Sequence, residues 1–229
     1  HEAPEMLTQA VYGLTELYRE EIKQSDLVAN PGCYPTGAIM PLAPLLKAGV
    51  IENEGIIVDS KSGVSGAGRT AKDASHFCEV NEGIRAYGVG THRHGQEIAQ
   101  ELSLAGDQPV EMVFTPHLVP MNRCILTTSY SRLQKGVAGS KVREVLEAAY
   151  GPEPFVQVLP EGVMPHTKWV YGSNQLHIGT YVDEATGRVI LISALDNLTK
   201  GASGQALQNM NLLLGLDETT GLKMLGVHP

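Results

Sequence analysis

The chain has 229 residues, of which 42% are hydrophobic, and this length can bury the core of one large domain or one and a half. The chain has 17 Lys and Arg and 25 Asp and Glu, which give a formal net charge of -8. The basic residues are scattered singly along the sequence. The sequence therefore has no positive stripe that could bind a phosphate backbone or an anionic membrane surface, and we expect neither nucleic acid nor membrane as a partner. No apolar run reaches the roughly 20 residues of a membrane span.

The beginning of the sequence and its cysteines bear on where the protein works. His1-Glu2-Ala3-Pro4 has neither an initiator Met nor a signal-peptide pattern, so we expect the start of a longer protein to be missing. Cys33, Cys78 and Cys124 are an odd number and form no Cys-x-x-Cys pair. This usage is typical of a reducing compartment, and we expect a cytoplasmic protein.

The first third of the chain predicts helices, a short strand and two turns. Apolar side chains at helical spacing predict a helix over 5–24, and 27–29 predict a strand. A turn at 30–36 leads into a helix up to residue 49, which Pro41 and Pro44 should kink or interrupt because each removes a backbone donor. A buried strand at 56–58 then runs into the glycine-rich stretch 62–69, where we expect no regular element.

The remainder of the chain is richer in strands. Apolar and β-branched runs predict strands at 110–118, 123–132, 176–182 and 188–195, with one helix at 140–150. Sequential strands with short turns favour a largely antiparallel sheet covered by helices on one face, within the α/β class. A last helix over 202–214 carries Ala206, Met210, Leu213 and Leu214 on one stripe, which should pack against another element.

Cys33 is the candidate nucleophile. A cysteine at the start of a helix faces unpaired backbone N–H groups and the positive end of the helix dipole, and both stabilise a thiolate. Asn30 would place a polar side chain beside the sulfur. The alternative is a buried structural cysteine, which is the interpretation of Cys78 and Cys124.

Two histidines stand where a helical pattern begins, at His92-Arg93-His94. Histidine exchanges protons near neutral pH, as thiol chemistry requires. His94 lies nearer the helix start, and we expect His92 to cap the helix or hydrogen-bond locally, although either could be a solvated or packed side chain. Together with His117 they also resemble metal ligands, but no carboxylate cluster stands at a typical spacing, and we expect no metal.

Two further segments could contact a ligand. The glycine-serine stretch Ser62 to Arg69 could admit a flat ring or hold an anion on its amides, and Arg69 or Arg123 could pair with phosphate or carboxylate. Asn197, which opens the last helix, could cap that helix or present its amide to a ligand.

Five segments in a fixed order carry a family resemblance. They are Pro31-Gly32-Cys33-Tyr34-Pro35-Thr36, Ser62-Gly63-Val64-Ser65-Gly66-Ala67-Gly68-Arg69, His92-Arg93-His94, Phe114-Thr115-Pro116-His117 and Asp196-Asn197-Leu198-Thr199-Lys200-Gly201-Ala202. With them the chain resembles the N-acetyl-γ-glutamyl-phosphate reductases, arginine-pathway relatives of aspartate-semialdehyde dehydrogenase. The strand and glycine-rich turn that hold the cofactor pyrophosphate in that family do not precede residue 30.

The resemblance implies a division of the chain into three parts. Residues 1–32 would be the remnant of a Rossmann NADP-binding domain. Residues 33–196 would be a catalytic and dimerisation domain like that of glyceraldehyde-3-phosphate dehydrogenase, with a mixed, largely antiparallel sheet. Residues 197–229 would be a C-terminal helix and tail that return to the NADP-binding domain, and the assembly would be a homodimer or homotetramer.

The resemblance also implies the reaction. Cys33 would attack N-acetyl-γ-glutamyl phosphate, phosphate would leave, and NADPH would reduce the thioester to N-acetylglutamate 5-semialdehyde. A sulfur of low pKa attacks and leaves well. His94-Gly95-Gln96 is similar to the His-Ser-Gln of aspartate-semialdehyde dehydrogenase, whose histidine is the base, so we expect His94 to be the acid/base, with His92 as the other candidate.

The remaining implied contacts concern cofactor and substrate. Ser62, Gly63, Ser65 and Gly66 would line the nicotinamide pocket, with Asn197 beside the carboxamide, and the residues expected to bind substrate are Asn30, His92, Arg93 and Arg123. Two other readings share parts of this pattern: a cofactor-free Cys-His hydrolase or acyltransferase, and a non-catalytic oligomerisation module.

Overall fold

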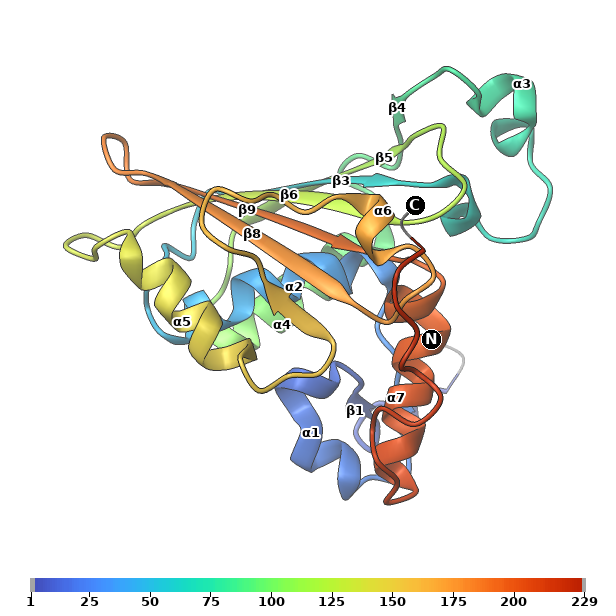
Figure 1. The fold of residues 1–229 in the computed structure, drawn as a ribbon, viewed down its shortest axis with the longest axis horizontal. Coiled ribbons are helices and arrows are strands. Elements are labelled where there is room, and N and C mark those ends of the chain that lie inside the picture. Colours follow the sequence, from blue (N-terminus) through green and yellow to red (C-terminus); the bar gives the residue numbers. More distant parts are fainter. Residues whose placement is uncertain (1–2, 228–229) are drawn as a thin grey trace.

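A mixed sheet lies at the centre of the fold. The computed structural model describes residues 3–227. The outermost residues of the expected parts 1–32 and 197–229 therefore lie outside the described residues. The strands of the sheet are β3 (Ile56–Ser62), β4 (Arg85–Ala86), β5 (Met112–Leu118), β6 (Ile125–Arg132), β7 (Val156–Val158), β8 (Leu176–Asp183) and β9 (Arg188–Leu195), in the spatial order β4-β5-β3-β6-β9-β8-β7 (Figure 1). The pairs β3 with β5 and β7 with β8 are parallel, and the other neighbours are antiparallel. The predicted mixed, largely antiparallel sheet is confirmed.

Helices cover one face of this sheet. They are α2 (Cys33–Lys47), α4 (Arg93–Gly106) and α5 (Ser140–Tyr150), whereas α3 (Phe77–Val80) projects from one end and α6 (Thr167–Val170) contacts β9 (Figure 1). The predicted strands at 110–118, 123–132, 176–182 and 188–195 and the helix at 140–150 are confirmed. Within residues 3–227, no helix is long and apolar enough to cross a membrane.

Helix α2 runs without interruption from Cys33 to Lys47, so the helix does not break at Pro41 or Pro44 as one of the two expected outcomes had it. Each proline leaves the carbonyl four residues earlier without its helical donor. The carbonyl of Gly37 accepts instead from Ser193 Oγ at 2.6 Å, and that of Met40 accepts from the Tyr150 hydroxyl. Neighbouring elements therefore replace both missing bonds, and the helix continues unbroken from its first turn, which carries Cys33.

The predicted single helix over 5–24 is wrong. The structure has a 3-10 turn η1 (Pro4–Met6), the strand β1 (Val11–Tyr12) and the helix α1 (Thr15–Lys23). Strand β1 pairs in parallel with β2 (Val28–Ala29), the strand predicted at 27–29. At Gly13, between β1 and α1, a Cβ would lie 2.5 Å from the side-chain nitrogen of Asn209, so this position has no room for a side chain.

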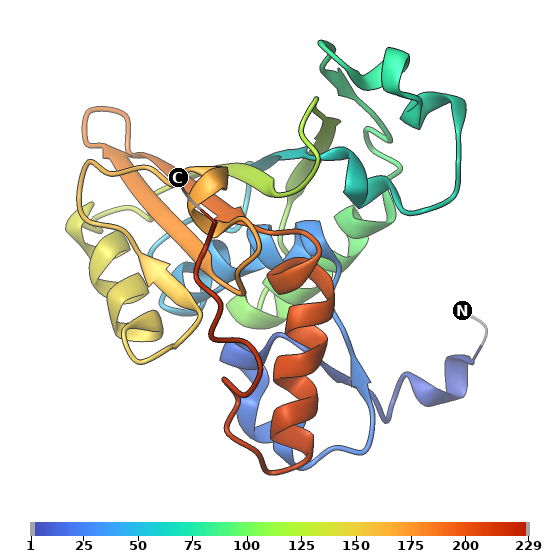
Figure 2. The ribbon, with the colours of Figure 1, turned by 45° about the vertical axis from the view of Figure 1, so that its right-hand side comes forward.

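The last helix differs from its prediction in both start and face. A π-helical turn, η4 (Thr199–Ser203), precedes α7 (Gly204–Leu213), which lies beside α1 and β1 in both views (Figures 1 and 2). The buried face is polar: Gln205 and Asn209 each donate to the Gly13 carbonyl at 2.9 Å. The predicted apolar stripe is exposed at Met210, Leu213 and Leu214, because hydrogen bonds to the backbone of the N-terminal segment outweigh apolar packing on this helix.

The glycine-rich stretch is more regular than expected. Strand β3 continues through Ser62, and Val64–Ala67 form the 3-10 turn η2. A second short 3-10 turn, η3 (Asp73–Ser75), lies in the excursion that carries α3. Short elements of this kind have no periodicity that a sequence pattern could reveal.

Candidate functional site

A cavity of about 580 Å³ opens where the first turns of α2 and α4 meet η2 and η4. It brings together seven of the predicted site residues, which are Asn30, Cys33, Ser65, Gly66, Arg93, His94 and Asn197. Four predicted site residues do not line it, namely Ser62, Gly63, His92 and Arg123.

Cys33 is half-buried at the first position of α2, as predicted. Burial raises the pKa of its thiol above the ordinary value, although the backbone N–H groups of Tyr34 and Cys33 act in the opposite direction. The nearby Glu97 carboxylate also raises this pKa, whereas Arg93 lowers it. The structure therefore does not support the expectation of a low-pKa sulfur, because desolvation outweighs the helix terminus.

His94 is the buried histidine of the cavity. Burial lowers the pKa of its imidazole to about 4, with further lowering by His92 and Arg93, so the ring is neutral at physiological pH and able to accept a proton. Its Nε2 lies against Gly32, the residue before Cys33, where a built Cβ would be only 2.5 Å away. A neutral base therefore stands beside the turn that carries Cys33.

His92 has a different environment. It is the N-cap of α4, and its Nδ1 accepts a hydrogen bond from the backbone N–H of His94 at 3.2 Å, so the expected capping role is confirmed. Its ring packs edge-on against Tyr34 and Phe114. The cap fixes where α4 begins and hence where His94 points.

Glu97 is a cavity residue that the sequence argument missed. Its Oε1 accepts from the backbone N–H of Gly32 at 2.9 Å and from the Tyr12 hydroxyl at 2.7 Å. It follows His94 by three positions, so both side chains lie on one face of α4. That spacing was the available signal, because a carboxylate one turn after a candidate base reaches the same site.

The opposite wall of the cavity is formed by η2 and Asn197. Asn197 is buried, accepts from the backbone N–H of Cys124 at 2.6 Å and donates to Ser65 Oγ at 3.0 Å. A Cβ on Gly66 would lie 2.5 Å from Ser62 Oγ, so position 66 has no room for a side chain. Ser62 donates to the carbonyl of Gly63 at 2.9 Å, and neither residue lines the cavity.

Two of the predicted substrate-binding residues make contacts within the chain. The Arg123 Nε donates to Oδ1 of Asp196 at 3.2 Å, and its Nη2 lies 2.9 Å from Oδ2 of the same fully buried carboxylate. The guanidinium also lies over the Tyr171 ring. Asn30 donates to the Ala202 carbonyl at 3.2 Å at the edge of the cavity. Arg123 is thus a structural ion-pair partner, and Arg93 is the cationic side chain among the lining residues.

The arrangement of the possible metal-ligating side chains is known for the described residues. In the described part of the chain, no three His, Cys, Asp or Glu side chains are arranged to hold a metal ion. His92 and His94 lie with their ring centroids 4.8 Å apart, and Nδ1 of His92 is occupied by the cap.

Comparison with known sequences identifies relatives over the whole chain. Residues 33–197 match the family model described as semialdehyde dehydrogenase, dimerisation domain. The chain is 60% identical to the N-acetyl-gamma-glutamyl-phosphate reductase of Geobacter sp. (strain M21) and 58% identical to that of Rhodospirillum rubrum, in each case over 100% of this chain. It spans 66% and 65% of those proteins, slightly less than two thirds of their length.

Solved structures support the fold. Aspartate semialdehyde dehydrogenase II from Vibrio cholerae superposes with a TM-score of 0.73 at 18% sequence identity, covering 91% of this chain and 69% of that one. A probable aspartate-semialdehyde dehydrogenase from Pseudomonas aeruginosa gives a TM-score of 0.72, also at 18% identity, with the same coverage of each chain. The α/β fold with a helix-covered mixed sheet is therefore shared with these enzymes.

Proposed function

Because this chain belongs to the N-acetyl-gamma-glutamyl-phosphate reductase family and carries its dimerisation domain, we propose that its protein is an oxidoreductase of arginine biosynthesis. The reaction is the NADPH-dependent reduction of N-acetyl-γ-glutamyl phosphate to N-acetylglutamate 5-semialdehyde, with release of phosphate. The observation that carries the proposal is a thiol, Cys33, and a neutral imidazole, His94, at two helix starts that face one cavity.

The first half of the reaction forms a thioester. His94 takes the proton of the Cys33 thiol, and the sulfur attacks the acyl carbon of the substrate. The carbon–oxygen bond to phosphate breaks, and phosphate leaves with the bonding electrons. The unpaired N–H groups at the start of α2 stabilise negative charge that develops next to the sulfur.

Glu97 and Arg93 have supporting roles in this half. Glu97 holds the Gly32 peptide by its N–H, which fixes the turn on which Cys33 stands. Arg93, the cation of the cavity, is suited to pair with the phosphate or carboxylate of the substrate. Asn30 lines the same cavity, whereas His92 acts through the helix cap.

The cavity wall fits a nicotinamide ring. Gly66 adds no side chain to the wall, and the Asn197 amide donates one N–H to Ser65, which leaves a second donor for a carboxamide. Ser65, Gly66 and Asn197 would hold the ring, with Ser62 and Gly63 behind them. When bound, the cofactor supplies the hydride that reduces an acyl group to an aldehyde.

The second half restores the site. Cys33 leaves as the thiolate when the carbon–sulfur bond breaks and the aldehyde departs, and the imidazolium of His94 returns its proton to the sulfur. His94 therefore ends as the neutral base with which it began. A buried imidazole suits this role because it carries the proton only while the sulfur lacks it.

The outer face of the sheet is proposed as the surface for a homodimer or homotetramer. Over β3 and β5 this face carries no helix in residues 3–227, and it exposes Ile57 and Val113 (Figure 1). Such a patch is typical of subunit contacts. We place the catalytic and dimerisation unit at 33–196, between the segments 1–32 and 197–229, in a cytoplasmic protein.

A phosphate-release assay tests the proposed function. The chain is mixed with N-acetyl-γ-glutamyl phosphate without cofactor, and release should stop at about one equivalent per chain, because the thioester has no hydride donor. Cys33→Ser should release none above the uncatalysed rate. Continuous release would instead support a Cys-His hydrolase or acyltransferase, and an unreactive Cys33 would support a non-catalytic module.

A further inference from the structure

Lys200 and Glu16 form an ion pair in the interior of the molecule. Lys200 Nζ lies 2.6 Å from Glu16 Oε1, and both side chains are 0% exposed. A buried pair is costly to desolvate and is often replaceable by apolar residues without loss of stability. Stability alone therefore gives no reason for charges at these two positions.

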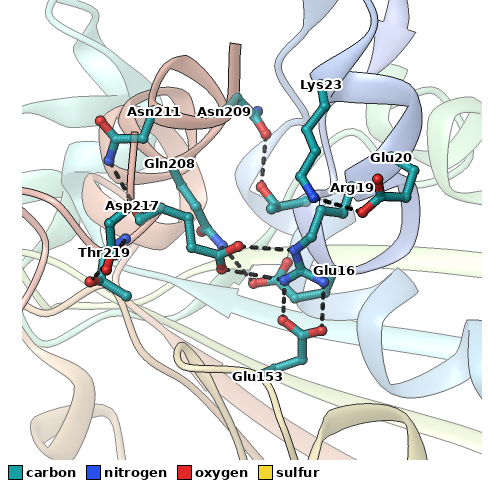
Figure 3. A network of polar contacts seen from close by, with 12 residues as sticks. Glu16, Arg19, Glu20, Lys23, Glu153, Gln208, Asn209, Asn211, Asp217 and Thr219 are labelled. Atoms are coloured by element: carbon teal, nitrogen blue, oxygen red, sulfur yellow. Dashed lines mark hydrogen bonds and ion pairs between the residues drawn. The ribbon is translucent and has the colours of Figure 1, made fainter. Parts of the chain in front are cut away.

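The pair joins segments that are distant in sequence. Glu16 belongs to α1, and Lys200 belongs to η4. Gln208 of α7 accepts from Lys200 Nζ at 2.9 Å and donates to Glu16 Oε1 at 3.1 Å, and Figure 3 shows Glu16 and Gln208 in one network with Arg19 and Glu153. The Lys200 side chain therefore donates to acceptors on two different helices, α1 and α7, and these two contacts fix both its position and its orientation.

The turn that carries Lys200 touches the candidate nucleophile. In η4 the Gly201 N–H donates to the Asp196 carbonyl at 2.9 Å and the Ser203 N–H to the Leu198 carbonyl at 3.1 Å, both five residues back. A Cβ on Gly201 would lie 2.8 Å from the Cβ of Cys33, so the Gly201 backbone covers one side of that cysteine.

A π-helical turn needs an external anchor, because the same residues could form the ordinary i→i−4 bonds of an α-helix. A slip of one residue would rotate Gly201 away from Cys33. Lys200 resists this rotation because its side chain is tied outside the helix, to α1. An apolar side chain of similar volume would fill the same space without fixing the rotation.

We propose that Lys200 is a positioning residue for the proposed reaction: its buried ion pair with Glu16 locks the η4 turn, and through Gly201 this turn fixes the position of Cys33. The proposal rests on the proposed role of Cys33 as nucleophile. The juxtaposition that carries it is a fully buried charge pair at one position and direct backbone contact with Cys33 at the next.

The test compares two rates at Cys33 in the whole chain: alkylation by iodoacetamide, and acylation by N-acetyl-γ-glutamyl phosphate followed by mass spectrometry. The test variant is the double exchange Glu16→Leu with Lys200→Met, which removes both charges and keeps the volume. Gln208 retains Asn174 and Glu218 as partners in this variant. A loosened Gly201 should uncover the thiol, so alkylation should rise about tenfold while acylation falls about tenfold through misplacement.

Two further variants sharpen the comparison. Arg19→Met with Glu153→Leu is the matched control, because this pair of the same network ties α1 to the loop before β7 (Figure 3). The side-chain hydrogen bonds of Arg19 go to Glu153 and Glu218, and neither residue belongs to η4. The control should leave both rates within about twofold of the parent. Glu16→Gln leaves the buried ammonium without its counter-charge and lowers stability, but it keeps an acceptor for Lys200 Nζ. The folded variant should therefore keep both rates, which a requirement for charge itself would not allow.

A folded double variant with parental rates would overturn the proposal, as would a control pair that shifts both rates equally. Should the double variant not fold, Glu16→Gln decides, since a tenfold change there contradicts a positional role. If the parent is not acylated at all, the proposed function fails, and the alkylation rates still test the positioning of Cys33 on their own.

Discussion

Gly32 and His94 are in such close contact that position 32 has no room for a side chain: a Cβ there would lie 2.5 Å from Nε2 of His94 and 2.9 Å from two ring carbons. The glycine thus allows the candidate base to reach the turn that carries the candidate nucleophile.

Gly32→Ala should displace the imidazole and leave the fold intact. We expect the rate of Cys33 acylation to fall by about tenfold to a hundredfold, because proton transfer is sensitive to sub-ångström placement. Gly95→Ala is the matched control, since its Cβ meets only Phe114 at an ordinary 3.7 Å, and a helical alanine there should add about 1 kcal/mol of stability. Equal acylation rates in the two variants would contradict the relationship.

The buried His94 makes stability depend on pH in a definite direction. Its pKa is lowered from 6.5 to about 4 in the folded chain, so the unfolded chain binds the proton more readily. The stability contributed by neutral His94 is fully present above pH 6.5 and is lost as the pH falls toward 4. Urea unfolding of His94→Gln should therefore show a shallower loss across this window than the parent, whereas the exposed control His76→Gln should follow the parent. Parallel curves for parent and His94→Gln would refute the lowered pKa.

Arg123 should matter for stability and not for substrate binding. Arg123→Met leaves the fully buried Asp196 carboxylate without its partner, and we expect a loss of about 3 kcal/mol in the free energy of unfolding. The concentration of acyl phosphate at half-maximal acylation should not change. Arg69→Met, at an exposed loop position, should alter stability by less than about 0.5 kcal/mol. A weakened acyl-phosphate dependence in a stable Arg123→Met protein would restore the residue to the substrate site.

The outer sheet face should lose self-association when charged. Val113 is 56% exposed on β5, and Val113→Asp would bury a carboxylate at a subunit contact. We expect sedimentation equilibrium to show self-association weakened by roughly a hundredfold. Leu104→Asp is the control, because Leu104 is 65% exposed on α4, on the other side of the sheet. An unchanged assembly in Val113→Asp would exclude this face as the contact.

Local periodicity was sufficient where one face of an element packs on the sheet. The strands β5, β6, β8 and β9 and the helix α5 were predicted from alternating or helical apolar spacing. Periodicity failed where tertiary hydrogen bonds determine the structure. Ser193 and Tyr150 donate to the α2 carbonyls that its prolines leave without a helical donor, and α7 buries glutamine and asparagine. Donors that come from distant parts of the chain have no signature in the local sequence.

The candidate site was predictable in its residue types and less so in their roles. Cys33, His94 and Asn197 were found from their places at helix starts and in motifs, and the cap at His92 followed from its position before α4. The partner of Arg123 could not be inferred, because Asp196 comes from a different strand end. The raised pKa of Cys33 was also missed, since burial is a property of the folded chain.

The most direct test of the account is the intact mass of the chain after incubation with N-acetyl-γ-glutamyl phosphate, followed by peptide mapping. Cys33→Ser serves as the control, and Cys78 and Cys124 serve as internal references in the same spectra. We expect one N-acetylglutamyl adduct, on Cys33, that is absent from Cys33→Ser. An unmodified Cys33, or an adduct that persists in Cys33→Ser, would contradict it.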